Sequence, residues 1–318
     1  MSFFNWSKPT NKPTRKKLKK MRNKSISNKT MNCSPLVEGQ TVSDDTCYTS
    51  DALLKIATAY NKNNPTNKIV STDPKVIFAE LKTKLTKCKK EDCWLSQLPE
   101  SEQKYLDEFL FAPDKPSEWK KNANEWLSNI DIFEVLKQYE KKYKNFKLFE
   151  PTPIDFDTRL PENNQKCVQE ELCKISLETL IQNKINKVGI VFNLDKHDQG
   201  GSHWTSMFID IENQFIFYFD SAANELPTEV NTLVKKIKSQ GQQLSNPIQF
   251  KFYSNKNHRH QSSNTECGMY SLFFIITMLT GKTDHDNQMT VSQKLKLFRN
   301  KKIPDKYVEK YRNIYFND

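Results

Sequence analysis

Residues 261–270 read QSSNTECGMY, and residues 271–279 continue as SLFFIITML. The first part is polar and ends in Cys267-Gly268, whereas the second part is apolar and long enough for a buried helix. We therefore expect Cys267 in the first turn of a core helix. The unpaired N–H groups and the positive dipole end at that position favour a thiolate anion. Cys267 is thus a candidate nucleophile, although most cysteines are inert core residues and the assignment depends on its neighbours.

Two expected strands upstream supply the partners that a nucleophilic cysteine needs. Residues 200–210 read GGSHWTSMFID, and residues 214–222 read QFIFYFDSA. Antiparallel pairing across a turn at 212–213 would bring His203 close to Asp220. His203 would then be the base and Asp220 the residue that orients it.

Two further positions fit the same chemistry. Gln261 can offer its side-chain amide, beside the backbone N–H of Cys267, to an oxyanion. Gly268 would let a substrate backbone approach the nucleophile closely. Among the other histidines, His258 and His260 lie close to Gln261 in a polar loop, where we expect them to be solvated.

In combination, the His203-Trp204 pair, the Asp220 strand end and the Gln261-x5-Cys267-Gly268 helix start resemble the Ulp1/SUMO-protease and adenain clan of cysteine proteases. The chain is most similar to the polyprotein-processing proteases of large nucleocytoplasmic DNA viruses, such as the African swine fever virus protease. The resemblance covers roughly residues 120–285. It implies an α+β, papain-like fold of the Ulp1/adenain type, in which helices flank a mixed sheet and a helical N-terminal arm precedes the core.

The resemblance also implies substrate-binding residues. Residues 125–139 suggest a loop that leads into an amphipathic helix capped by Ser128 or Asn129. In the clan, a Trp-Leu segment at this place lines the substrate channel, so Trp126 is a candidate for gripping the residues before the scissile bond. An equally good interpretation is that Trp126 anchors the core. Trp204 and Gly268 are the other expected substrate contacts.

Charge and apolar content divide the chain into three parts. Residues 1–30 contain ten Lys or Arg and no acid, which leaves +1 of the net charge of +11 for the remainder. We expect a disordered basic tail over 1–30, a helical arm domain over 31–117 and a protease core over 118–318. The arm is either a packing module or a docking surface. No apolar run reaches the 18 residues that suggest a membrane span, and the N-terminus has no secretory signal.

Several helices and strands are expected from local patterns. Helices are predicted over 51–60, 75–85, 102–110, 168–183 and 227–242, and strands over 187–194 and 247–254. The helix over 75–85 should begin with Asp73 as its cap and Pro74 at its first position.

The seven cysteines are odd in number and unevenly spread, which fits a reducing compartment better than a disulfide framework. The pairs Cys88/Cys93 and Cys167/Cys173 are spaced too widely for a common zinc knuckle. We therefore expect neither a metal ion nor a cofactor.

The function that these observations favour is a cysteine endopeptidase that cuts after Gly-Gly-x sequences in viral structural polyproteins during virion maturation. The alternative is a deconjugating protease for SUMO or another ubiquitin-like modifier. A thiol-dependent acyltransferase, or a nucleic-acid tether with a degenerate triad, fits less well. The expected partner is a protein substrate. The tail is either a solvated segment with no specific role or a tether, and only a tether makes nucleic acid a further partner. The expected location is the virion and the host cytoplasm, or the nucleus if the tail is an import signal.

Overall fold

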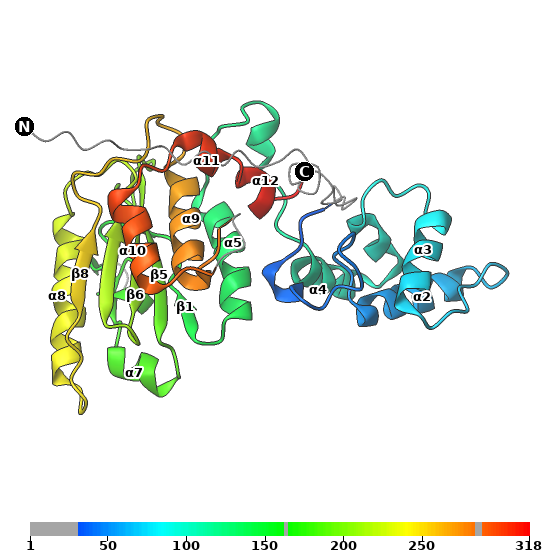
Figure 1. The fold of residues 1–318 in the computed structure, drawn as a ribbon, viewed down its shortest axis with the longest axis horizontal. Helices are drawn as coiled ribbons and strands as arrows, with labels where there is room; N and C mark the ends of the chain where they lie inside the picture. The colour runs from blue at the N-terminus through cyan, green and yellow to red at the C-terminus, as the bar shows by residue number, and fades with distance from the viewer. Residues whose placement is uncertain (1–30, 162–164, 284–287) are drawn as a thin grey trace, which may run out of the picture.

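A computed structural model describes residues 31–161, 165–283 and 288–318. The basic tail predicted over 1–30 lies outside these residues. Figure 1 shows a sheet flanked by helices on one side of the molecule and a smaller group of helices on the other. This second group corresponds to the expected arm, while its boundary near residue 117 stays a prediction. Within the described residues, no helix is both long and apolar enough to cross a membrane.

The described part of the arm contains three α-helices that local sequence signals delimit. Its elements are η1 (Pro35–Val37), α2 (Ser50–Asn63), α3 (Pro74–Lys84), η2 (Asp92–Gln97) and α4 (Glu100–Leu110). The Asp73 side chain accepts a hydrogen bond from the Lys75 N–H, and Pro74 stands at the first helical position, as predicted. Apolar faces of these helices pack around Tyr48 and Trp94, whose stacked rings have centroids 5.3 Å apart.

The core holds a six-stranded mixed sheet in the order β1-β5-β6-β7-β8, with β2 also pairing with β5. Its strands are β1 (Phe146–Leu148), β2 (Thr152–Pro153), β5 (Lys187–Asn193), β6 (Trp204–Asp210), β7 (Phe215–Phe219) and β8 (Lys251–Ser254). β5, β6 and β7 pair antiparallel, as predicted for β6 and β7, whereas β1, β2 and β8 each join by parallel pairing. The expected mixed α+β fold is confirmed.

Side chains that alternate along the strands cover the two faces of the sheet. On β7, Phe215, Phe217 and Phe219 belong to the cluster that contains α5 (Asn129–Lys142) and α9 (Cys267–Thr280), whereas Ile216 and Tyr218 belong to the cluster that contains α8 (Thr228–Gln243). Such alternation follows from the two-residue period of a strand. The α9 residues are buried almost throughout because this helix lies between the sheet and other helices.

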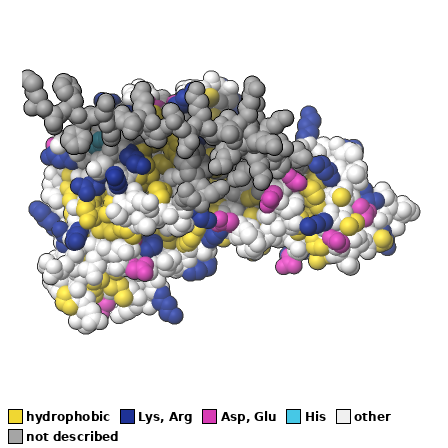
Figure 2. Space-filling model, viewed as in Figure 1, with side chains coloured by type: hydrophobic (Ala, Val, Ile, Leu, Met, Phe, Trp, Pro, Cys, Tyr) yellow, Lys and Arg dark blue, Asp and Glu magenta, His cyan; other side chains and the backbone are white. Residues whose placement is uncertain are grey.

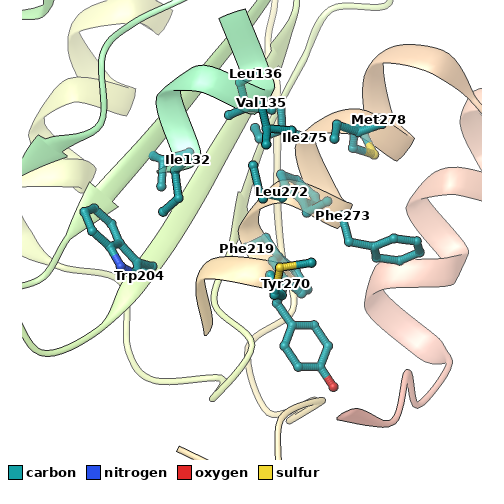
Figure 3. Close-up of a cluster of buried hydrophobic side chains, with 14 of the residues drawn as sticks. Ile132, Val135, Leu136, Trp204, Phe219, Tyr270, Leu272, Phe273, Ile275 and Met278 are labelled. Carbon is teal, nitrogen blue, oxygen red and sulfur yellow. The ribbon is translucent and has the colours of Figure 1, made fainter. Parts of the chain in front are cut away.

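Figure 3 shows how α5 and α9 meet in this core. Ile132, Val135 and Leu136 of α5 point toward Leu272 and Ile275 of α9. α5 begins at the predicted Ser128 cap, where Ser128 and Asp131 form a capping box. This packing holds the start of α5, and the loop before it, against α9.

Two local predictions were wrong. The helix expected over 168–183 is two short helices, α6 (Glu170–Cys173) and α7 (Leu177–Gln182), because Ser176 caps α7 by accepting from the Thr179 N–H. The strand expected over 247–254 covers only its second half as β8, where pairing with β7 begins at Lys251.

The cysteine prediction was also wrong for six of the seven residues. The structure joins Cys33 to Cys47, Cys88 to Cys93 and Cys167 to Cys173, with Cα–Cα distances of 5.1, 5.5 and 6.3 Å that suit disulfides. An odd total does not exclude a disulfide framework when one thiol has another task. Within the part of the chain that the structure describes, the free cysteine is Cys267.

The C-terminal part of the chain joins the arm to the core. Besides η3 (Ser117–Lys120), the remaining elements are β3 (Arg159–Leu160), β4 (Lys166–Cys167), α10 (Val291–Asn300), α11 (Asp305–Glu309) and α12 (Arg312–Tyr315). α12 lies at the junction of the two groups of helices (Figure 1). Just after it, the Asn317 side chain exchanges hydrogen bonds with the Asn32 backbone, and its amide also donates to the Ala112 carbonyl at 2.8 Å.

Candidate active site

The three residues of the predicted triad come together at one end of the sheet. His203 directly precedes β6, Asp220 directly follows β7, and the pairing of Ser206 with Phe219 places these ends side by side. The His203 Nε2 lies 2.6 Å from the Asp220 Oδ1. Cys267, the first residue of α9, interacts electrostatically with the His203 side chain. Because Nε2 faces Asp220, the other ring nitrogen of His203 is the one left for Cys267.

The charges of this group stabilise one another. Burial lowers the pKa of His203, but hydrogen bonds to Asp220 and Cys267 outweigh burial and raise that pKa to about 9. Burial raises the pKa of Asp220, but the hydrogen bond with His203 and the backbone N–H groups of Ala222 and Asn224 lower it below its usual value. At neutral pH the arrangement therefore holds an imidazolium against a carboxylate.

Asp220 is held rigidly by residues that no pattern in the sequence singles out. Its Oδ1 accepts from the Ala222 N–H at 2.8 Å, and its Oδ2 accepts from the Asn224 N–H at 3.0 Å. The Asn255 side chain accepts from the Asp220 N–H and donates to the Asp220 carbonyl. Asn255 lies just past the end of β8, so only the pairing of β7 with β8 reveals its place in the site.

Gln261 lies buried beside this group with its amide orientation defined. The Ser221 hydroxyl donates to the Gln261 Oε1 at 2.6 Å, and the Gln261 Nε2 donates to the Ser263 carbonyl at 2.8 Å. One Nε2–H remains for another acceptor. The backbone N–H of Cys267, at the start of α9, has no acceptor within its own helix. Two donors suited to a developing oxyanion are thus present.

A pocket of about 560 Å³ opens next to Trp204, and His203, Asp220, Cys267 and Gln261 do not line it. Its wall combines Trp126 and the loop before α5 with the segment that leads to His203, and it includes Asn193, Asp195, Lys196, His197, Gln199, Gly200, Gly201 and Trp204. Trp126 is half-buried. Its position fits both interpretations made from the sequence, since it lines a pocket and also packs against the protein.

Trp204 and Gly268 both contact Leu127, the residue that follows Trp126. The Trp204 indole N–H donates to the Leu127 carbonyl at 2.9 Å. A Cβ on Gly268 would lie 3.1 Å from the Leu127 Cβ and 3.4 Å from the Trp204 ring. The small size of Gly268 therefore lets Leu127 pack onto the start of α9. A direct contact of Trp204 or Gly268 with substrate stays a prediction.

The prediction that the loop histidines are solvated was wrong for His260. This residue is fully buried, its Nε2 donates to the Phe298 carbonyl at 2.8 Å, and the Ile303 N–H donates to its Nδ1. Burial lowers the pKa of His260 to about 4. His260 therefore stays neutral and holds the loop that carries Gln261 against the C-terminal helices.

The raised pKa of His203 predicts the alkaline limit of activity. A histidine whose pKa is raised on folding stabilises the folded state at pH values below its unfolded pKa. This stabilisation is lost as the pH rises through the folded pKa. We expect kcat/KM to fall about tenfold per pH unit above pH 9, because the imidazolium proton is lost. In Asp220→Asn this limb should move to lower pH. A pH–rate profile with the limb unchanged in that variant would show that Asp220 does not set it.

Comparisons with known proteins agree with this geometry. Residues 183–313 match the family model described as the Ulp1 protease family, C-terminal catalytic domain. A protein of Acanthamoeba polyphaga mimivirus that is named as a thiol protease is 31% identical over 299 residues, which are 86% of this chain and 90% of that protein.

Proteins of African swine fever virus that are named as cysteine proteases are also similar. One is 31% identical over 161 residues, which are 49% of this chain and 58% of that protein. A crystal structure of an African swine fever virus protease has the same fold, with a TM-score of 0.60 and 22% identity over 90% of this chain and 95% of that chain. The relationship to the mimivirus protein extends over nearly the full length of both chains. This chain belongs to the Ulp1 family of cysteine proteases.

Proposed function

We propose that this protein is an endopeptidase that works through a Cys267-His203-Asp220 triad and cleaves after Gly-Gly-x sequences in a structural polyprotein. The observation that carries the proposal is the hydrogen bond between His203 and Asp220, at 2.6 Å, together with the interaction of His203 with Cys267 at the start of α9. An acid-base residue, a residue that orients it and a nucleophile within hydrogen-bond reach are what covalent acyl transfer requires.

In the first half-reaction, the Cys267 sulfur attacks the scissile carbonyl carbon as a thiolate, while His203 is the imidazolium. The carbonyl oxygen becomes an oxyanion, which the Gln261 Nε2–H and the Cys267 N–H stabilise. When the C–N bond breaks, the His203 imidazolium gives its proton to the leaving amine. Asp220 accepts from His203 throughout and keeps the ring oriented.

In the second half-reaction, neutral His203 takes a proton from water, and the resulting hydroxide attacks the thioester carbonyl. The C–S bond breaks, and Cys267 leaves as the thiolate beside the newly protonated His203. The products are a carboxylic acid and the amine released earlier. The site therefore returns to its starting charge state after each turnover.

Selection for glycine before the cut is supported by how closely the Trp126 loop approaches the nucleophile helix. Trp126 lines the pocket that Gly201 and Trp204 also line, and Leu127 packs directly onto Gly268. A narrow approach of this kind favours residues without a Cβ. The basic tail is proposed to hold the enzyme to nucleic acid in an assembling virion, since ten of its thirty residues are Lys or Arg.

Removal of a SUMO-like modifier is the alternative. It is favoured by the name of some African swine fever virus relatives, which is SUMO-1 cysteine protease. The two activities differ in what the enzyme must contact, because a deconjugating protease also binds the folded modifier.

The test is to compare cleavage of short Gly-Gly-x peptides with cleavage of the same sequence at the end of a folded ubiquitin-like domain. The polyprotein protease should cleave both with kcat/KM values within about tenfold, a difference of about 1.4 kcal/mol. A peptide rate more than roughly a thousandfold lower would favour the alternative. Cys267→Ala serves as the blank for each substrate.

A further inference from the structure

We infer that Arg312 is a positioning residue that acts on the nucleophile through Glu266, an inference that rests on the proposed function of Cys267. Arg312 belongs to α12, 46 residues along the chain from Glu266. Glu266 directly precedes Cys267. Both side chains are buried, with relative exposures of 5% for Arg312 and 0% for Glu266.

The contact between them is bidentate. The Arg312 Nε donates to the Glu266 Oε2 at 3.1 Å, and the Arg312 Nη2 donates to Oε1 at 2.9 Å. An unpaired buried carboxylate on the residue that precedes Cys267 would oppose a negative charge on the sulfur, because like charges repel. The guanidinium neutralises that carboxylate. We therefore expect Arg312 to let Cys267 ionise beside Glu266.

The second step concerns the backbone donors of α9. Glu266 is the N-cap residue of this helix, a position where a polar side chain commonly accepts from the first free N–H groups. Among the residues that the structure describes, its side chain makes no such capping bond. Arg312 holds the carboxylate instead, which leaves the N–H groups of the first turn to the site. One of these is the Cys267 N–H assigned to the oxyanion.

Arg312 also contacts the segment that precedes Trp126. Its Nη1 donates to the Glu125 carbonyl at 3.0 Å, and its guanidinium lies over the Trp119 ring at 4.3 Å. The Trp119 indole N–H donates to the same Glu125 carbonyl at 3.1 Å. Since Glu125 precedes Trp126, one side chain ties the substrate loop to the residue before the nucleophile.

Other charged groups lie around the start of α9, and a substitution of Arg312 does not alter them. His203 and Asp220 approach from the sheet. From α11, the Asp305 carboxylate accepts from the Ser263 N–H and from the Tyr270 hydroxyl. A substitution of residue 266 or 312 therefore changes one charge while the other charged residues near Cys267 are the same in every variant.

The experiment measures alkylation of Cys267 by iodoacetamide as a function of pH, without reductant, with the labelled peptide identified by mass spectrometry. In Arg312→Met the midpoint of the alkylation profile should rise by roughly one pH unit, because Glu266 is left unpaired. In Glu266→Gln it should fall, because a negative charge is removed while Arg312 remains. The double variant should return close to the wild-type midpoint.

Opposite shifts distinguish a positioning role from a merely structural one, which would move both single variants in the same direction or neither. Arg312→Met should also lower kcat at least about tenfold, with KM changed less than about threefold. If this variant does not fold, Glu266→Gln alone decides, and an unchanged or raised midpoint overturns the inference. Arg299→Met is the matched control, since the Arg299 guanidinium lies over the Tyr253 ring.

Alkylation does not require turnover, so the inference and the proposed function fail separately. A wild type that cleaves no peptide, but whose variants shift in opposite directions, would contradict the substrate assignment and keep the role of Arg312. A wild type that cleaves peptides, but whose variants show unchanged alkylation midpoints, would support the substrate assignment and contradict the role of Arg312.

Discussion

Replacement of Cys267 by Ala should lower peptide cleavage by about 10⁴-fold or more, because the reaction loses the atom that forms the acyl-enzyme. Cys267 is the first residue of α9 and is the free cysteine among the described residues, so no other thiol can take its place by a small shift. His203→Ala should cause a loss of similar size. Asp220→Asn should leave measurable turnover, since an amide can still orient the ring while carrying no charge.

The measurement is single-turnover cleavage of a fluorogenic Gly-Gly-x peptide with enzyme in excess. Ser271→Ala is the matched control, because Ser271 is buried in the same helix one turn after Cys267. Its activity should stay within about threefold of wild type. Cleavage by Cys267→Ala at the wild-type rate would exclude Cys267 as the nucleophile. Equal losses in Cys267→Ala and Ser271→Ala would indicate damage to α9 rather than lost chemistry.

Replacement of Gln261 by Ala should lower kcat about 10²- to 10³-fold, while KM changes little. The Gln261 amide is proposed to bind the oxyanion, which exists only after attack, so its loss affects the transition state more than substrate binding. Steady-state kinetics that resolve kcat from KM are the measurement. An unchanged kcat with a raised KM would place Gln261 in substrate binding instead.

Ser221→Ala refines this test. The Ser221 hydroxyl donates to the Gln261 Oε1 and so determines which end of the amide faces the cleft. Losing that donor should lower kcat by a smaller factor, about tenfold, since the amide can still rotate into place. Gln240→Ala is the control for removing an amide, because Gln240 of α8 binds the Leu177 N–H and the Ile175 carbonyl.

The fold class and the triad could be predicted because their signals are local. Apolar runs of distinct length separated the β5 strand from the α9 helix, and the polar-to-apolar change at Cys267 located the start of that helix. His203 and Asp220 could be paired because a single short turn joins their strands, so their register leaves few choices.

The features that were missed depend on contacts between residues far apart in the sequence. Arg312 has no local pattern that points to Glu266, and Asn255 reaches Asp220 only through the pairing of β7 with β8. The burial of His260 likewise depends on the C-terminal helices that cover it. The composition of this loop predicted that it is solvated, because composition does not show which distant residues pack against a loop.

The net charge of the chain is concentrated in the tail and is small in the rest of the protein. Figure 2 shows basic and acidic side chains interspersed on the visible face of the arm. This agrees with a charge of +1 for all residues beyond the tail. The body therefore offers little bulk attraction to an anionic polymer, and an effect of salt on binding should follow the tail.

The hydrogen bonds between Asn32 and Asn317 have a consequence for how the chain folds. They join residues 285 positions apart, whereas Gln138 of α5 donates to the Glu108 and Phe111 carbonyls of the arm across only 30 and 27 positions. Long sequence separation between contacting residues slows folding, because the entropy of closing the loop is lost before the contact forms. The arm can therefore dock on α5 first, and closure of the 312–317 segment onto Asn32 is then the late, slow phase. Since that segment also carries Arg312, refolding should restore the native far-ultraviolet circular dichroism before it restores catalysis.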